Sequence, residues 1–217
     1  MRITWLATAV SAIVLAFAVP AFASDYSFTS TSMNSPESVS IDGQGTLMAP
    51  MQFTDGIMTL EAWCLDVTHH IGVGGQSPPL EYDEDPLTTS TSLNGNLPFN
   101  AFQIGQFSYL INILAPSLGN IHQLNAVQGA LWNISLGGVG HVLSGDSTIQ
   151  SYIDGYTTLG LTSSRPLFAM ESVGATSLVQ DFAHGGAVPE PASWALMIIG
   201  FGAAGAMLRK RRQFALA

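Results

Sequence analysis

Residues 56–75, GIMTLEAWCLDVTHHIGVGG, form the most strand-like stretch of this 217-residue chain. Successive side chains of a β-strand point to opposite faces, so Leu60, Ala62 and Cys64 share one apolar face. Asp66 follows two residues later in the same alternation. Cys64 is the only cysteine, and it therefore cannot close an internal disulfide. The stretch predicts a strand that carries a free thiol on an apolar face.

Apolar residues recur with helical spacing in the middle of the chain. The spacing predicts helices over residues 101–115, 121–136 and 148–156, the first ended by a proline and the second by a glycine pair. Short strands are expected within residues 24–50 and again over 166–179. Strands, a helical insert and further strands together predict an α+β fold.

Residues 72–100 show no periodicity and are expected to form a long loop. The loop contains an acidic cluster, EYDED at residues 81–85, and carboxylates are ligands that calcium prefers. The cluster lacks the spaced acids and the glycine of a helix–loop–helix calcium site, which favours a solvated acidic loop. We therefore expect no metal and no other cofactor.

The first 23 residues resemble an export signal in their layout. Arg2 precedes an apolar run, and the run ends in the small-x-small pattern Ala21-Phe22-Ala23. A membrane anchor is the alternative, but the run is short and ends in a cleavage pattern. Residues 1–23 are therefore predicted to be a secretory signal peptide that is removed after Ala23.

The C-terminal residues 187–217 contain a second apolar run, over residues 194–208, followed by basic residues at 209–212. The run is slightly shorter than the lower limit of about 17 residues for a membrane-spanning helix. Basic residues stay on the cytoplasmic side of a membrane, so the preceding chain is expected to lie outside. The tail predicts a single transmembrane helix that anchors an exported domain.

A short motif precedes this run and consists of Pro189, Glu190, Pro191, Trp194 and Ala195, in the form PEPxxWA. Motif, helix and basic tail together resemble the PEP-CTERM sorting signal of exported proteins in Gram-negative bacteria. The resemblance implies an exosortase-type processing enzyme as a partner and attachment to the inner membrane through the helix. It also implies delivery to the cell surface or the extracellular matrix, in a family often linked to exopolysaccharide and biofilm.

Residues 24–186 lie between the two signals and are long enough for one domain with a core. All fifteen acidic residues fall between Asp25 and Glu190, where Arg165 is the only basic residue, so the formal charge there is −14. A surface this acidic repels nucleic acid and anionic membrane surfaces. We therefore expect no nucleic-acid partner.

Gln128 lies on the apolar stripe of the second predicted helix, four residues before Trp132. A buried carboxamide must be hydrogen-bonded, and Gly129 beside it would let another backbone approach closely. One interpretation is a satisfied buried amide. In the other, the Cys64 thiolate displaces ammonia from the carboxamide and forms an internal thioester. Burial raises the pKa of a thiol, so a base such as Asp66 or a histidine would have to assist.

Three blocks of this chain are similar to bacterial thioester domains. AWCLD at residues 62–66 resembles their cysteine block, and VQGALW at 127–132 resembles their glutamine block, roughly Thr-Gln-x-Ala-Ile-Trp. IGQFSYLINILA at 104–115 resembles the helix that precedes the glutamine block. This chain has Val127 in place of the threonine.

The thioester-domain resemblance implies a β-sandwich-like domain with a helical insert, displayed on a surface protein that binds amines covalently. Carried over residue by residue, Cys64 and Gln128 would form the thioester, with Asp66 and Trp132 in support. No lysine lies between the two signals, so the domain has no ε-amine to attack its own thioester and cannot form a Lys–Asn isopeptide crosslink.

Three functions therefore remain open. The first is a surface-anchored binding protein that captures an amine-bearing partner covalently at Cys64–Gln128. The second is a structural exopolysaccharide-matrix protein with the same fold and a free thiol. The third is a Cys-dependent hydrolase, with a base among the five histidines: His69, His70, His122, His141 and His184. No histidine has metal-ligand spacing and no hydrolase or nucleotide-binding motif occurs, so we expect a protein that is not an enzyme.

Overall fold

The computed structural model describes residues 25–67, 69, 71, 74–91, 93, 98–173, 180–185 and 199–201. The predicted signal peptide and most of the predicted sorting tail lie outside these residues; residues 199–201 are helical. Within the described part of the chain, no helix has the length and the apolarity needed to cross a bilayer.

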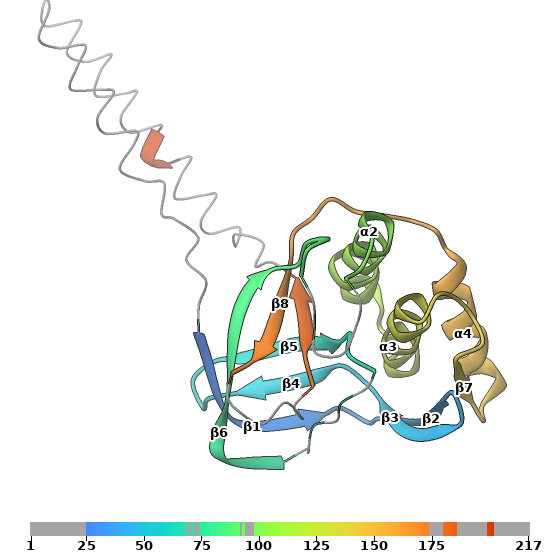
Figure 1. Ribbon diagram of the computed structural model, residues 1–217, viewed down its shortest axis with the longest axis horizontal. Helices are drawn as coiled ribbons and strands as arrows, with labels where there is room; N and C mark the ends of the chain where they lie inside the picture. Colours follow the sequence, from blue (N-terminus) through green and yellow to red (C-terminus); the bar gives the residue numbers. More distant parts are fainter. Residues whose placement is uncertain are drawn as a thin grey trace, which may run out of the picture.

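Six antiparallel strands close into a barrel in the order β1-β4-β5-β9-β8-β6 (Figure 1). They are β1 (Asp25–Met33), β4 (Met51–Thr54), β5 (Thr59–Cys64), β6 (Gly74–Pro86), β8 (Leu167–Ser172) and β9 (Phe182–Gly185). A separate three-stranded sheet has the order β3-β2-β7. Its strands are β2 (Glu37–Ile41), β3 (Gln44–Met48) and β7 (Val142–Ser144).

The helices lie together on one side of the barrel, and the small sheet lies next to them (Figure 1). They are α2 (Ala101–Tyr109), α3 (Ile121–Ser135) and α4 (Ser147–Thr158). A π-helical turn, Leu110–Leu114, and a 3-10 turn, Ala115–Ser117, continue α2. The predicted α+β fold with a helical insert between strands is confirmed, and the three predicted helices agree with the observed ones to within a few residues.

Helices α2, α3 and α4 each begin after a residue whose side chain accepts a hydrogen bond from the first turn. Asn100 caps α2 in a capping box with Gln103, Asn120 caps α3, and Asp146 caps α4. A cap of this kind satisfies backbone N–H groups that have no partner inside the helix. These caps fix the starts of the helices that the apolar spacing predicted.

The predicted loop over residues 72–100 is wrong, because its first half is the long strand β6. Asp83 pairs with Asp25 of β1 on one side and with Glu171 of β8 on the other. The acidic residues 81–85 therefore belong to a strand, and no cluster of metal ligands is found among the described residues. Acids and prolines disfavour strands locally, but pairing with two neighbours outweighs this preference.

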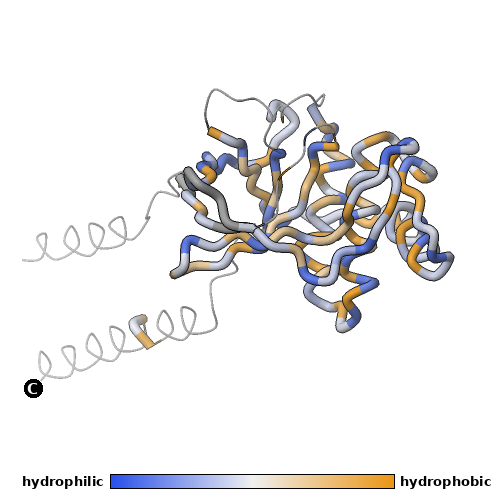
Figure 2. The backbone as a smooth tube through the Cα atoms, turned by 90° about the horizontal axis from the view of Figure 1, so that it is seen from below, coloured by the Kyte–Doolittle hydropathy of each residue, from blue (hydrophilic) through white to orange (hydrophobic). Residues whose placement is uncertain are grey.

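The core has two parts. Inside the barrel, Phe53 contacts the rings of Phe28, Tyr82 and Phe182 at centroid distances of 5.1, 5.5 and 4.9 Å. The second part lies between the barrel wall and the helices, and it includes Trp63 of β5. Hydrophobic and hydrophilic segments are interspersed along the backbone of the domain (Figure 2), as expected for elements with one buried face.

Candidate functional site

Cys64 and Gln128 meet where the end of β5 packs against α3. The Gln128 side-chain Nε2 donates to the Cys64 carbonyl oxygen at 2.7 Å, and the Cys64 backbone N–H donates to Gln128 Oε1 at 2.9 Å. Both residues are buried, at 2% and 0% exposure. One carboxamide therefore satisfies both backbone groups of the cysteine, although 64 residues separate them.

The strand pairing explains why the cysteine backbone is available to a side chain. The pairing of β5 with β4 ends at Ala62, which lies opposite Met51, so β4 supplies no partner for Cys64. On the other side, Cys64 lies opposite Phe182 of β9. Buried backbone groups need partners, and Gln128 supplies them in place of a strand.

Gly129 allows α3 to approach the rest of the domain closely. A Cβ atom at this position would lie 2.6 Å from Met48 Sδ and 3.0 Å from Ile153 Cγ1. The sequence predicted that another backbone would approach this glycine, whereas side chains from β3 and α4 do so. The absence of a side chain lets α3 pack between these elements beside Gln128.

The Cys64 sulfur lies against the chain that follows β5. Its thiol donates to the Asp66 carbonyl oxygen at 2.8 Å. Burial raises the pKa of the Cys64 thiol well above its ordinary value, and the charges of Asp66 and Asp181 raise it further. The Trp132 indole N–H faces the sulfur and favours the thiolate, but it makes no full hydrogen bond. As a free side chain, Cys64 is therefore a protonated thiol.

Asp66 does not continue the strand alternation that the sequence predicted. Strand β5 ends at Cys64, so Asp66 no longer follows its alternation, and it is the backbone oxygen of Asp66 that contacts the sulfur. The carboxylate is fully buried and lies 2.6 Å from Nδ1 of His69, whose backbone N–H also donates to it at 3.3 Å. The side chain of Asp66 thus holds the chain after β5 in place.

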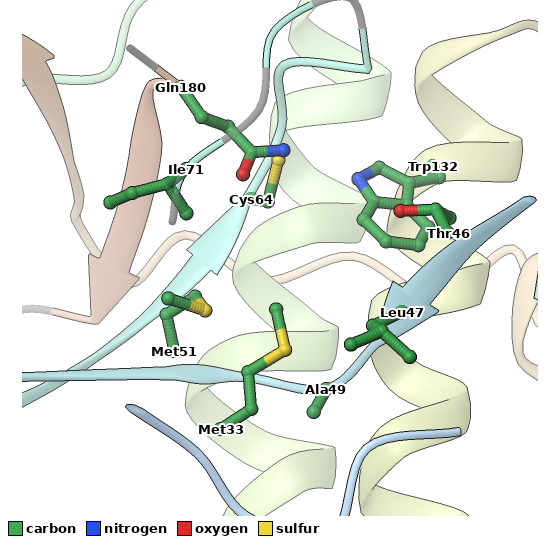
Figure 3. Close-up of a pocket in the computed structure, with 9 residues that line it drawn as sticks. All are labelled: Met33, Thr46, Leu47, Ala49, Met51, Cys64, Ile71, Trp132 and Gln180. Atoms are coloured by element: carbon green, nitrogen blue, oxygen red, sulfur yellow. The ribbon is translucent and has the colours of Figure 1, made fainter. Parts of the chain in front are cut away.

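A pocket of about 260 Å³ opens beside the sulfur (Figure 3). Its walls are largely apolar, and Figure 3 labels all nine lining residues. Trp132 and Gln180 lie on either side of the Cys64 sulfur. Leu47, at 42% exposure, lies at the solvent side. A small reagent therefore has a route from solvent to Cys64.

Gln180 is the residue of this site that sequence analysis did not identify. Its side-chain Nε2 donates to the Asp66 carbonyl oxygen at 3.0 Å, the same oxygen that accepts the Cys64 thiol. It lies just before β9, far from Cys64 in the sequence. No local pattern marks a single glutamine there, so only the strand pairing of β5 with β9 could reveal it.

Each described histidine lies beside a carboxylate. The pairs are His69–Asp66 at 2.6 Å, His122–Glu37, His141–Asp42 at 2.9 Å and His184–Glu84 at 3.7 Å. The hydrogen-bonding neighbours of the Cys64 sulfur in the described part are the Asp66 carbonyl and the Trp132 indole, with no imidazole among them. A Cys–His pair of the hydrolase type is not formed by these residues.

The residues of the predicted sorting motif, Pro189 to Ala195, lie outside the described part of the structure. In sequence, residues 187–212 match the PEP-CTERM protein-sorting motif. Comparison with curated proteins gave no significant match.

Two solved structures are similar to this chain. One is the N-terminal thioester domain of a surface protein from Clostridium perfringens, with 14% identity, a TM-score of 0.49, and coverage of 64% of this chain and 89% of that one. The other is the N-terminal thioester domain of the fibronectin-binding protein SfbI from Streptococcus pyogenes, with 13% identity, a TM-score of 0.42, and coverage of 70% and 93%. The chain thus carries a PEP-CTERM sorting motif, typical of exported, cell-surface-directed proteins, and is structurally similar to thioester domains of bacterial surface proteins.

Proposed function

We propose that this exported protein binds an amine-bearing partner covalently through an internal thioester between Cys64 and Gln128. The observation that carries the proposal is the pair of hydrogen bonds between the Gln128 carboxamide and the Cys64 backbone. These bonds hold the carboxamide beside the residue that carries the only thiol of the chain. The protein acts stoichiometrically, as a binding protein and not as an enzyme.

Thioester formation begins when the Cys64 thiol leaves the Asp66 carbonyl oxygen. The sulfur attacks Cδ of Gln128, the Cδ–Nε2 bond breaks, and ammonia leaves with the thiol proton. The Cys64 N–H, which donates to Oε1 at 2.9 Å, stabilises the negative charge that develops on this oxygen. The same N–H assists when an amine later attacks Cδ and the sulfur leaves.

The surroundings favour a thioester that survives until a partner arrives. Cys64 and Gln128 are buried, which limits attack by water. Residues 24–208 contain no lysine, so this part of the chain offers no ε-amine of its own. The partner would enter through the pocket beside Cys64 and would bring a primary amine on the cell surface or in the surrounding matrix.

The sorting tail supplies the location in this proposal. The PEP-CTERM motif implies processing by an exosortase in general. We infer that the predicted helix over residues 194–208 holds the chain in the inner membrane before processing, with the domain outside.

A second function is a structural matrix protein in which Cys64 stays a free thiol. The raised pKa of the buried thiol favours this alternative, because a protonated thiol is a weak nucleophile. The two functions share fold and location, and they differ only in whether the Cys64–Gln128 bond exists.

Mass spectrometry of the denatured, exported protein separates the two. We expect a mass lower by one ammonia, a thiol that does not react with iodoacetamide, and the gain of one methylamine after treatment. Cys64→Ala and Gln128→Ala should each abolish the deficit, whereas Gln106→Ala, a buried glutamine of α2, should retain it. A full mass with an alkylated Cys64 would refute the thioester and support the matrix protein.

A further inference from the structure

Gln180 is held at two points beside the Cys64 sulfur. Its side-chain Nε2 donates to the Asp66 carbonyl oxygen at 3.0 Å, and its own carbonyl oxygen accepts from the Tyr82 hydroxyl at 3.4 Å. The Cys64 thiol donates to the same Asp66 oxygen at 2.8 Å. The carboxamide and the sulfur therefore share one oxygen atom as hydrogen-bond acceptor. Figure 3 shows the Gln180 carboxamide beside the Cys64 sulfur. At 8% exposure, Gln180 has little freedom to turn away.

Trp132 faces the sulfur from α3. Its ring is 3% exposed, and its indole N–H lies in the pocket without a full hydrogen bond. In Figure 3 the nitrogen edge of the ring is turned towards Cys64 and Gln180. Buried N–H groups normally have a partner, and the acceptor that this one approaches is the sulfur. A thiolate is a stronger acceptor than a thiol, so it would complete this hydrogen bond.

The charged groups around Cys64 oppose a thiolate. Asp66 follows β5 and Asp181 precedes β9, and both carboxylates disfavour a second negative charge on the sulfur. Tyr82 of β6 also faces this cluster, and its pKa is raised by burial, by Asp181 and by Cys64. His69 is turned to the Asp66 carboxylate. The stabilisation of a thiolate must therefore come from neutral hydrogen-bond donors.

We propose that Gln180 and Trp132 form a pair of hydrogen-bond donors that holds the Cys64 sulfur as a thiolate whenever the thioester forms or opens. The proposal rests on the thioester function. Gln180 is a positioning residue: it binds the Asp66 oxygen that the thiol leaves, and it presents its remaining N–H to the sulfur. Trp132 donates from the opposite side.

The two donors act at the same atom in both directions of the reaction. In formation, they stabilise the thiolate that attacks Cδ of Gln128, while the thiol proton leaves with ammonia. In capture, the bond between the amine nitrogen and Cδ forms as the Sγ–Cδ bond breaks. The sulfur then leaves as a thiolate between the donors and takes the proton of the attacking amine.

The proposed donor pair, Gln180 and Trp132, is tested by the pH dependence of Cys64 alkylation with iodoacetamide, measured after methylamine treatment. Treatment leaves Cys64 free whether or not a thioester had existed. We expect Gln180→Leu and Trp132→Phe each to shift the pH profile of the iodoacetamide rate upwards by about one unit, which is about a tenfold slower reaction at fixed pH, because one hydrogen bond to a charged group is lost. Met33→Leu, which lines the pocket without a donor, should leave the profile unchanged.

A merely structural role for these residues would lower stability without moving the profile of the folded protein. Thermal unfolding of every variant identifies those that remain folded at the assay temperature. Should Gln180→Leu fail to fold, Gln180→Glu replaces it; a carboxylate there should shift the profile upwards more than the loss of the donor. Profiles of folded Gln180 and Trp132 variants that coincide with the parent profile would overturn the proposal.

The outcome of these alkylation experiments is independent of the mass measurement that tests the thioester. A parent protein with full mass would refute the thioester while the shifted profiles still supported the donor pair. A parent protein with the ammonia deficit and unshifted variants would refute the donor pair alone.

Discussion

The barrel interior and the junction of β5 with α3 are both fully buried, but their chemistry differs. The interior is held by aromatic rings, with Phe53 in contact with Phe28, Tyr82 and Phe182. The junction buries polar groups, among them Asp66, Gln128 and Asp181 at 0% exposure. Buried polar groups destabilise a fold unless they are paired. Packing thus specifies the first region, and hydrogen bonds specify the second.

This difference teaches where function is to be sought. An apolar interior tolerates substitutions that keep its volume, whereas a polar junction requires particular partners. A domain that needed only stability would fill the junction with apolar side chains. The polar groups concentrated around Cys64, the only cysteine of the sequence, are the reason for proposing the function at this junction.

The largest expected effect comes from Phe53→Ala in the barrel. Loss of the ring removes contacts to three other aromatic rings and leaves a cavity, which should lower the free energy of unfolding by about 3–5 kcal/mol. Urea unfolding followed by fluorescence measures this change. Phe53→Leu serves as the control and should lose less; equal losses would contradict specification by packing.

Gln128→Ala breaks the junction instead of the barrel. Compared with the amide form of the protein, the backbone N–H and carbonyl of Cys64 lose their partners in a buried site, which should lower the free energy of unfolding by about 2–4 kcal/mol. The matched Gln106→Ala in α2 should change stability by less. A loss at Gln128 no larger than at Gln106 would show that the two hydrogen bonds contribute little.

Gly129→Ala tests the close approach of α3. The added methyl group would lie 2.6 Å from the far end of the flexible Met48 side chain and 3.0 Å from Ile153, so we expect a loss of about 1–3 kcal/mol by overpacking. The double variant with Met48→Ala should recover part of it. Additive losses in urea unfolding would show that Met48 is not the obstacle.

The smallest effect is expected at Glu171, on the outside of the barrel wall. Burial raises its pKa above 4.5, and Asp181, Asp85 and Asp83 raise it further. A group whose pKa is higher in the folded state contributes to stability at a pH below its unfolded-state pKa. This contribution is lost as the pH rises through the folded-state pKa. Glu171→Gln should therefore raise the melting temperature slightly at pH 7. The gain in the free energy of unfolding should be less than about 1 kcal/mol, because the group is partly exposed.

Below pH 4.5 the difference between parent and Glu171→Gln should disappear, since both side chains are then uncharged. A control, Glu37→Gln, removes a carboxylate that lies beside His122 and should not raise the melting temperature. A Glu171 effect that is the same at pH 4 and pH 7 would exclude charge as its cause.

Several features of this domain were predictable because their signals are local. The caps Asn100, Asn120 and Asp146 lie next to apolar residues with helical spacing, so α2, α3 and α4 follow from a few neighbouring residues. The stretch before Cys64 alternates, and β5 ends at that residue. Local order of this type does not depend on distant partners.

Strand β6 shows where local signals fail. Its pairing with β1 is irregular at one place: Phe28 of β1 pairs with Leu80, whereas Ser30 pairs with Gly75. Pro78 and Pro79 lie in this gap, where ladder hydrogen bonds are not required of them. The lack of periodicity in residues 72–100 thus indicated a loop, while pairing with β1 and β8 produces a strand.

The amino-acid sequence alone therefore predicted the helices, the strand that carries Cys64, the acidic charge and the sorting motif. Each of these depends on the sequence and not on which elements pack together. The meeting of Cys64 with Gln128, the turn of Asp66 towards His69 and the position of Gln180 beside the thiol arise from folding. They join residues on separate elements, and their geometry depends on where β4 ends and where β9 pairs. Such contacts are fixed by packing in three dimensions; of these three, only the Cys64–Gln128 pair was expected, and that expectation came from the resemblance to thioester domains and not from local spacing.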